Sequence, residues 1–434
     1  MESQTYDFND GGSDMGGDER IGGPRSAIVV GAGIVGLSTA WFLQERGVEV
    51  TVVDGCGVAT GASWGNAGWV APALTLPLNS PAVLRYGLRS LRDRSAPLHI
   101  PMSADGALWR FLVQFAANCR QSVWDRAMQA NVPLNEDCLE AFDVLVANGV
   151  DAPVTDAPIT ALFRSAHDAE HLLRELRSLA DAGQSLSVTE LSGDALRAQA
   201  PLASQAIIAG VNVNGQRFVD PGRFVTALGR AVVDRGATLL TKDVRDVDGS
   251  GTGVVVRLAG GAPLTADTAV IATGAWLSRL AGRRLRVPVG SGRGYSFTVP
   301  ADRPLPGPVY LPDVRVACTP YRDGLRVAGT MEFRAPHHPV VADRVSAIVA
   351  SASPLLDGVR WDERSDVWVG PRPVTPDGRP VIGELSPHVF VAGGHGMWGL
   401  AHGPVTGRLL AEQITTGKQP EVLRPFDPRR RAVA

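Results

Sequence analysis

The first hydrophobic clusters along the chain predict a strand, a helix and a second strand in close succession. The run Ala27–Val30 is wholly apolar, which suits a parallel strand buried on both faces. A helical stretch follows it, and Gly47 is placed to cap the C-terminal end of that helix. Residues 48–53, which are rich in valine, predict the second strand. The pattern therefore predicts a β–α–β unit.

The turn between the first strand and the helix has the GxGxxG spacing of dinucleotide-binding folds. Gly31 makes the tight turn, Gly33 lets backbone approach a pyrophosphate, and Gly36 lets the helix pack on the strand. The N-terminus of the helix then stabilises the phosphate charge. Asp54 ends the second strand, 23 residues after Gly31, where a carboxylate accepts hydrogen bonds from a ribose hydroxyl. Together these features predict a dinucleotide site rather than an ordinary glycine-rich turn.

The residues that follow Asp54 narrow the choice of dinucleotide. The segment Asp54–Gly57 offers no arginine for the 2′-phosphate of NADP. On the evidence of the residues alone, both NAD and FAD remain candidates for the dinucleotide.

In two later segments, a predicted apolar strand is followed closely by glycine. The run Thr268–Ile271 leads into Thr273 and Gly274, where backbone can lie against a cofactor with no side chain between them. The short strand Val389–Val391 is followed by four glycines and a helical run, 405–414. A helix that begins in glycines points free N–H groups and a positive dipole end outward, which suits an anionic group. The alternative is a helix capped on solvent.

Composition and charge exclude several classes of protein. The 434 residues carry a net charge of −2, which gives no electrostatic reason to expect a nucleic acid partner. No apolar run approaches the roughly 20 residues that span a bilayer. The four cysteines are scattered, which is typical of reduced thiols and predicts a cytoplasmic protein. We expect residues 1–25 to be a disordered tail, and 426–434 to be a basic tail, solvated or in weak contact with the inner face of a membrane.

One motif resembles a metal-binding pattern, but the rest of the sequence does not support a metal site. His167–His171 reads HxxEH, a zinc-peptidase pattern, within an amphipathic helical stretch. Catalytic zinc needs a third protein ligand, and nothing in the sequence nominates one. We therefore predict no metal site.

An ordered set of motifs resembles a known family over about residues 26–425. The segment Gly61–Val70 is similar to the flavin-facing loop of the FAD-dependent D-amino acid oxidase superfamily, closest to the small subunit of the bacterial D-amino acid dehydrogenase branch. The other matching segments are 108–112, Asn118–Cys119, 220–224, 272–276, 287–296, 370–378 and 394–396.

The resemblance implies FAD as the cofactor and a set of residues around it. A reduced flavin carries negative charge near N1 and O2, which suits the predicted C-terminal helix. The implied FAD-binding residues are Gly31, Ala32, Gly33, Ile34, Val35, Gly36, Asp54, Ala62, Ser63, Asn66, Ala67, Gly68, Val244, Thr273, Gly274, Trp276, Gly396, Met397, Trp398, Gly399 and Leu400.

The resemblance also nominates substrate residues. Arg372 lies between two prolines, so its backbone is stiff, and a guanidinium held in this way can grip a carboxylate in a bidentate fork. In the resembling family the arginine of this motif binds the amino acid carboxylate. Tyr295, Tyr321 and His402 are further candidates, each with the alternative of ordinary packing.

The fold class implied is α/β with α+β character. A Rossmann-like FAD-binding domain is expected over 26–80, 198–286 and 367–425. A discontinuous mixed-sheet substrate domain of the D-amino acid oxidase and glycine oxidase type is expected over 81–197 and 287–366.

The activity implied is FAD-dependent oxidation of a D-amino acid, or a related secondary amino acid, by hydride transfer from Cα to flavin N5. The imino acid would hydrolyse to a 2-oxo acid, and the electrons would pass to a quinone or to O₂. The alternatives are a glycine/sarcosine-type amine oxidase that uses O₂, a flavin-dependent tailoring enzyme acting on another amine, and a flavin-binding protein without amino acid turnover.

Overall fold

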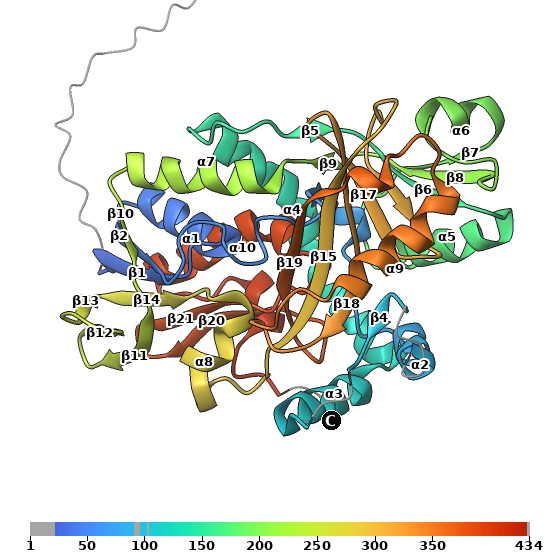
Figure 1. The fold of residues 1–434 in the computed structure, drawn as a ribbon. Helices are drawn as coiled ribbons and strands as arrows, with labels where there is room; N and C mark the ends of the chain where they lie inside the picture. Colours follow the sequence, from blue (N-terminus) through green and yellow to red (C-terminus); the bar gives the residue numbers. More distant parts are fainter. Residues whose placement is uncertain (1–21, 91–95, 102–103, 432–434) are drawn as a thin grey trace, which may run out of the picture.

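The chain folds around two large β-sheets. The computed structural model describes residues 22–90, 96–101 and 104–431. The predicted 1–25 tail lies almost entirely outside the described residues. In Figure 1 the sheet that carries the N-terminal strand lies beside a second sheet of long strands, and helices cover the outer faces of both. Within the described residues, no helix is both long enough and apolar enough to cross a membrane.

The first sheet has six strands and contains the predicted β–α–β unit. Its order is β10-β2-β1-β14-β21-β20, with the first five parallel and β20 antiparallel at the edge. The strands are β1 (Ser26–Val30), β2 (Glu49–Asp54), β10 (Thr238–Thr241), β14 (Thr268–Ile271), β20 (Val381–Ser386) and β21 (Val389–Gly393).

Helices and a small sheet cover the two faces of the six-stranded sheet. One face packs against α1 (Ile34–Glu45), α7 (Pro221–Asp234) and α10 (Gly399–Thr416). The other face packs against α8 (Leu277–Ala281) and a three-stranded sheet. That sheet consists of β11 (Val244–Ser250), β12 (Gly253–Leu258) and β13 (Leu264–Ala266).

The second sheet has nine strands, and its long strands lie beside the end of the first sheet. Its main path is β19-β15-β18-β17-β16-β6-β8-β7, and β4 pairs with β18. The strands are β4 (Leu98–His99), β6 (Ile159–Phe163), β7 (Val188–Leu191), β8 (Ala209–Val213), β15 (Gly290–Pro300), β16 (Val309–Leu311), β17 (Val316–Tyr321), β18 (Gly324–Phe333) and β19 (Ser365–Val374).

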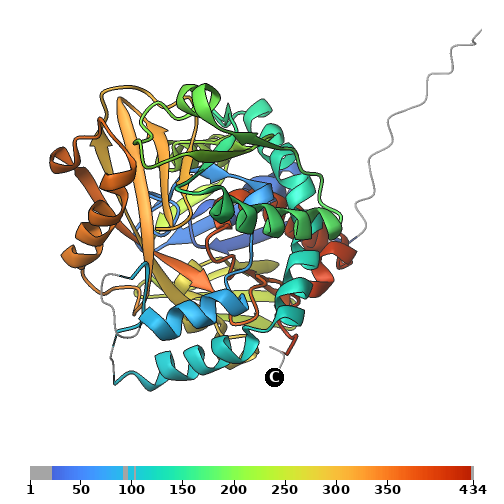
Figure 2. The ribbon, with the colours of Figure 1, turned by 90° about the vertical axis from the view of Figure 1, so that its right-hand side faces the viewer.

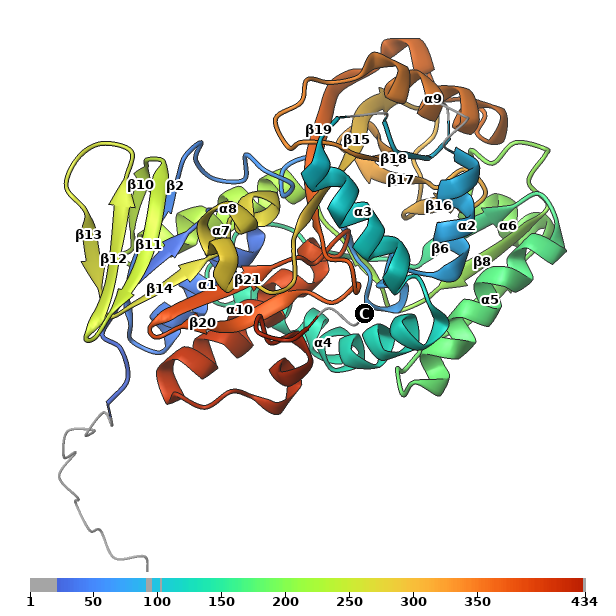
Figure 3. The same cartoon turned by 90° about the horizontal axis from the view of Figure 1, so that it is seen from below.

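Helices cover the nine-stranded sheet on both of its faces. Helix α9 (Ala342–Ala352) packs on β15 and β18, and in Figure 2 it lies on the outer side of the orange strands. Helix α5 (Ala166–Asp181) packs on β6 and β8. Figure 3 shows the two sheets side by side; β19 and β15 form the end of the nine-stranded sheet that lies toward the six-stranded sheet. The remaining elements include α2 (Pro81–Ser90), α3 (Gly106–Asn118), α4 (Gln121–Ala147), β5 (Thr155–Asp156), α6 (Gly193–Gln199), β3 (Trp69–Val70) and β9 (Arg217–Phe218).

Three elements pack with a different sheet from the one that their predicted domain range suggests. Helix α4 lies in the stretch assigned to the substrate domain, but it packs on α10 and joins the core of the six-stranded sheet through Leu134, Phe142 and Leu145. Strands β8 and β19 were placed in the FAD domain by the ranges 198–286 and 367–425, and both belong to the nine-stranded sheet. Pairing between distant strands decides these memberships, and local sequence does not record it.

The C-terminal segment is also more ordered than a solvated tail. The Arg430 side chain is only 10 % exposed and forms an ion pair with the buried carboxylate of Asp377. It also donates hydrogen bonds to the backbone carbonyls of Arg379 and Phe426. Residues 426–431 therefore pack on the body of the protein, which corrects the prediction for the described part of this segment.

Candidate active site

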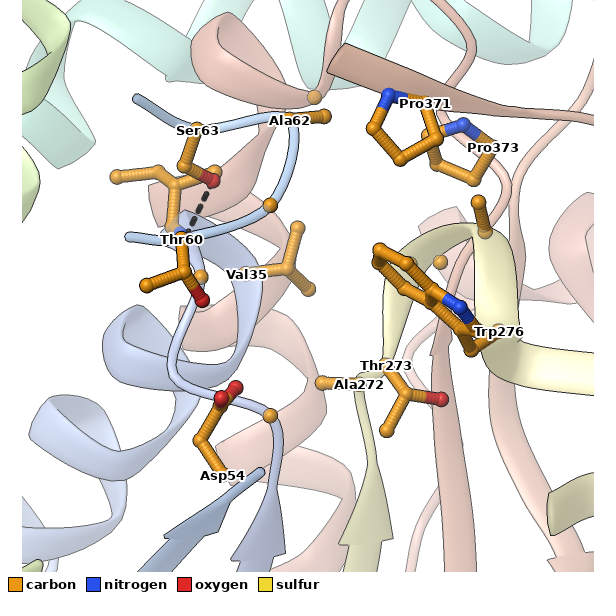
Figure 4. A pocket seen from close by; sticks show the side chains of 18 of the residues that line it. Val35, Asp54, Thr60, Ala62, Ser63, Ala272, Thr273, Trp276, Pro371 and Pro373 are labelled. Atoms are coloured by element: carbon orange, nitrogen blue, oxygen red, sulfur yellow. Dashed lines mark hydrogen bonds between the residues drawn. The ribbon is translucent and has the colours of Figure 1, made fainter. Parts of the chain in front are cut away.

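A cavity of about 280 Å³ opens where the carboxyl ends of β1, β2 and β14 meet β19. This is the usual place for a ligand in an open parallel sheet. In Figure 4, Asp54 and Ser63 lie on one side of the cavity, and Trp276, Pro371 and Pro373 lie on the other. The cavity therefore runs from the β–α–β unit to the nine-stranded sheet.

The three glycines of the first turn each have different structural surroundings. Gly31 has φ +115°, and a Cβ there would lie 2.5 Å from the Ala272 carbonyl oxygen. A Cβ on Gly36 would lie 2.0 Å from the Gly31 oxygen, so no side chain fits between helix and strand. A Cβ on Gly33 would meet only the Ser63 hydroxyl, at 3.1 Å. Gly31 and Gly33 line the cavity, whereas Gly36 lies behind it.

Asp54 lines the cavity and also ties the turn together. One carboxylate oxygen accepts a hydrogen bond from the Ala32 N–H at 2.9 Å. The other accepts from the N–H groups of Cys56 and Gly57 at 2.8 and 3.0 Å. The sequence pattern pointed only to a ribose, and it did not reveal this role in shaping the backbone. Ala32 itself does not line the cavity.

The loop after β2 forms the next part of the wall. Ser63 accepts a hydrogen bond from the Ile34 N–H at 3.1 Å and so caps the first turn of α1. Ile34, Val35, Ala62, Ser63 and Asn66 all line the cavity. Ala67 and Gly68 do not.

Ala67 and Gly68 instead hold the loop against the protein. The Ala67 carbonyl accepts a hydrogen bond from the Thr319 hydroxyl at 2.7 Å. A Cβ on Gly68 would lie 2.1 Å from the Val219 oxygen. These two residues therefore position the wall without forming it.

The opposite wall begins at the end of β14. Thr273, Gly274 and Trp276 line the cavity, as does Val244 nearby. The Thr273 hydroxyl is buried without a protein hydrogen-bond partner. The Trp276 indole N–H donates to Nε2 of His337 at 2.8 Å, which joins this wall to the loop after β18.

The N-terminus of α10 closes the cavity from the third side. Gly396, Met397, Gly399 and Leu400 line it. Trp398 does not, because its indole N–H donates to the Leu76 carbonyl at 3.0 Å and its ring packs in another cluster.

Arg372 lies in β19 and lines the cavity. One guanidinium nitrogen donates to the Thr330 carbonyl at 3.3 Å. Thr330 is β-branched and has φ +51°, a strained conformation for such a residue. Burial lowers the pKa of Arg372 to about 10. The side chain is thus a partly desolvated cation that faces a cavity.

Three predicted substrate residues do not line the cavity. Tyr295 is fully buried, and its hydroxyl donates to Glu332 at 2.6 Å. Tyr321 lies at the end of β17 under the guanidinium groups of Arg322 and Arg326, 5.0 and 4.5 Å from the ring centroid.

His402, the third of them, is packed between helices. Its Nε2 lies 2.7 Å from Oδ1 of Asn135 in α4. Burial lowers the pKa of His402 to about 4, so the ring is neutral at pH 7 and Nε2–H donates to the amide oxygen. The ring therefore packs between α10 and α4 and does not line the cavity.

The chain matches one family model over most of its length. The model describes FAD dependent oxidoreductases of the DAO family and matches residues 26–413. The chain belongs to this family. It is therefore a flavin oxidoreductase with the DAO-type fold.

Curated relatives and solved structures agree with the family assignment. A D-amino acid dehydrogenase from Vibrio vulnificus (strain YJ016) is 30% identical over 91% of this chain and 97% of its own. One from Agrobacterium fabrum is 29% identical over 92% and 97%. A glycine oxidase from Geobacillus kaustophilus has a TM-score of 0.72 at 24% identity, covering 94% and 98%. An L-alpha-glycerophosphate oxidase from Mycoplasma pneumoniae, solved with FAD bound, has a TM-score of 0.70 at 15% identity, covering 94% and 98%.

The cavity of this DAO family member has features that fit a bound FAD. The buried Thr273 hydroxyl has no protein partner. A Cβ on Gly274 or Gly396 would meet nothing within 4 Å, so the backbone there faces open space. The first turn of α1 supplies N–H groups that have no acceptor within the helix.

Several cavity residues were not predicted. Lys242 and Asp243 lie beside Asp54, and Trp368, His337 and His395 also line the cavity. Trp368 is four residues before Arg372 in a strand, so the period of two places both on one face, which was a usable signal. His337 and Lys242 carried no local signal, since loops bring them to the cavity.

The HxxEH motif lies on the solvent-exposed face of α5. The side chains of His167 and His171 are 84 % and 62 % exposed, and they pair with Glu170 and Glu175. Among the residues that the structure describes, no group of three metal-ligating side chains comes together.

Proposed function

We propose that this chain binds FAD non-covalently and oxidises a D-amino acid to an imino acid, which water then hydrolyses to a 2-oxo acid and ammonia. The D-amino acid dehydrogenases among the relatives and the FAD bound to a structural neighbour support this proposal. The observation that carries it is Arg372, a partly desolvated guanidinium that faces the cavity without a carboxylate partner among the described residues.

The cofactor would lie along the whole cavity. The turn 31–36 would hold the pyrophosphate, since the helix N-terminus and the open space at Gly33 suit it. Asp54 would receive the ribose hydroxyls on its remaining lone pairs. Thr273 would donate its free hydroxyl, and the N-terminus of α10 would stabilise negative charge on the flavin ring. FAD supplies the two-electron acceptor for the hydride that leaves Cα.

Arg372 would bind and orient the substrate carboxylate. Because burial destabilises its charge, an incoming carboxylate recovers electrostatic energy that an exposed arginine would lose to water. A guanidinium holds both oxygens of a carboxylate and so fixes Cα in one orientation.

The substrate amine would enter without its proton. The acidic residues that line the cavity are Asp54 and Asp243, at the β2 end, so neither reaches the amine. His395 also lines the cavity, but burial and the neighbouring His402 lower its pKa to about 3, and its Nε2 lies 3.0 Å from the Thr406 hydroxyl. With no general base at this end, the amine must bind in its neutral form.

Anaerobic mixing of the purified protein with D-, L- and N-methyl amino acids tests the proposal. We expect the visible flavin absorbance to bleach with D-amino acids and to return when an acceptor is added. A quinone and O₂, added separately, then identify the acceptor. Bleaching by sarcosine and glycine alone would favour the amine oxidase alternative, and no bleaching by any amino acid would refute the proposal.

A further inference from the structure

Two glycines face each other beneath two large side chains of the cavity wall, those of Arg372 and Trp368. Strands β15 and β19 are antiparallel, and their register pairs Gly294 with Gly370. A Cβ on Gly294 would lie 2.0 Å from Cζ of Arg372. A Cβ on Gly370 would lie 1.9 Å from Cη2 of Trp368. The guanidinium and the indole therefore occupy the space that two ordinary side chains would fill.

The pairing places the two groups side by side. Opposite residues of an antiparallel pair lie about 5 Å apart, so the Arg372 guanidinium and the Trp368 indole are neighbours on one surface. Both residues line the cavity. Trp368 is also fixed from the other side, because a Cβ on Gly65 would lie 2.6 Å from its ring. The indole thus has a fixed position and leaves one surface toward the cavity.

The charges nearby restrict what can lie on that surface. The other residues that line this end include Trp276, His337, Pro371 and Met397, and none of them carries a carboxylate. A cationic substrate side chain would find no carboxylate at this end of the cavity to pair with. A second carboxylate would have to leave water for the indole surface while the first carboxylate occupies the guanidinium.

We infer that Arg372 and Trp368 form one recognition unit, in which the guanidinium binds the α-carboxylate and the indole contacts an apolar substrate side chain. Gly294 and Gly370 are positioning residues that make room for the two groups. This inference rests on the proposed function and adds the substrate class: amino acids with apolar side chains.

The two glycines allow a test that leaves the fold intact. Each added methyl group would meet the far end of a side chain rather than backbone, so Gly294→Ala and Gly370→Ala displace that end and the strands stay paired. Gly251→Ala is the matched control, since its Cβ would meet nothing within 4 Å. Trp109, on α3 and 38 % exposed, serves as the control for Trp368.

Calorimetric binding of acetate and phenylacetate to the FAD-loaded protein separates the two groups. We expect phenylacetate to bind at least tenfold more tightly than acetate. Trp368→Ala should reduce that ratio to about twofold or less, and Trp368→Phe should retain part of it. Gly294→Ala should weaken both ligands about tenfold or more, Gly370→Ala should mainly weaken phenylacetate, and the two control variants should match the wild type.

Flavin reduction by a substrate panel completes the test. We expect kcat/KM for D-leucine and D-phenylalanine to exceed that for D-aspartate and D-lysine at least tenfold, and Trp368→Ala to remove most of this preference. If D-aspartate and D-lysine react as well as D-leucine, or if Trp368→Ala leaves the ranking unchanged, the inference fails while the proposed function stands. If no amino acid reduces the flavin, the proposed function fails and the inference fails with it.

Discussion

Replacing Arg372 with methionine should stabilise the protein and abolish its activity. The guanidinium makes one hydrogen bond, to the Thr330 carbonyl, and among the described residues it has no ion-pair partner. Methionine keeps an unbranched apolar stem and removes the charge. The structure therefore predicts opposite effects on stability and on substrate binding, which ordinary damage to the core would not produce.

The size of the stabilisation follows from the pKa of Arg372. A fall of this pKa from 12.5 to about 10 corresponds to roughly 3 kcal/mol that burial costs the charged form. Because the guanidinium is only partly buried, water screens some of that cost, and the lost hydrogen bond to Thr330 costs about 1 kcal/mol. We expect a net gain of about 1 kcal/mol in the free energy of unfolding.

Urea unfolding of FAD-loaded wild type and Arg372→Met measures this gain, with the exposed Arg110→Met as control. Anaerobic reduction by a D-amino acid measures the loss of activity. In Arg372→Lys, the ammonium keeps the charge without the planar fork, so the apparent affinity for substrate should fall about ten- to a hundredfold. An Arg372→Met protein that is clearly less stable than wild type, or that is reduced at the wild-type rate, would refute the reasoning.

Three further predictions follow from the cavity wall and the helices behind it. Gly33→Val should fold and lose FAD, whereas Gly36→Val should not fold stably, because its side chain would meet the Gly31 carbonyl. Flavin content and circular dichroism distinguish these two outcomes. A Gly33→Val protein with normal flavin content would show that the phosphates bind elsewhere. The pKa of His402 is about 4 in the folded protein and about 6.5 in an unfolded chain, so the unfolded state takes up more protons and stability should fall as the pH drops from about 6.5 toward 4. His402→Gln should reduce that slope in urea unfolding, while His395, whose pKa is also lowered by burial, retains part of it; an unchanged slope would contradict the assignment. Acid precipitation should release the flavin into the supernatant; colour that stays with the pellet would indicate a covalent bond.

The sequence predicted the parts of the site that depend on local signals. The glycine turn, Asp54 and the N-terminus of α10 each combine a strand end, glycines and a helix within a few residues, and all lie at the cavity. Arg372 was predicted because its two flanking prolines lie in a motif that resembles the family's carboxylate-binding motif, and its side chain lines the cavity. Its role toward substrate stays a prediction.

Strand geometry and long-range packing explain why some predicted residues lie away from the cavity and why others were not predicted. Tyr295 follows Gly294 by one residue, and the period of two therefore places it on the face that α9 covers, opposite Arg372. His402 points away from the cavity to Asn135, on a helix that the sequence had assigned to another domain. Trp368 was not predicted although the strand period places it on the face of Arg372; its contact with Gly65 joins distant segments and has no local signal.

The most direct test of the account is single-turnover anaerobic reduction of the FAD-loaded protein by D-leucine, with L-leucine and the Arg372→Met variant measured alongside. The account predicts complete bleaching of the wild-type flavin by D-leucine, little or none by L-leucine, and none in the variant at the same concentration. Equal bleaching by both enantiomers, or bleaching of the variant at the wild-type rate, would contradict it.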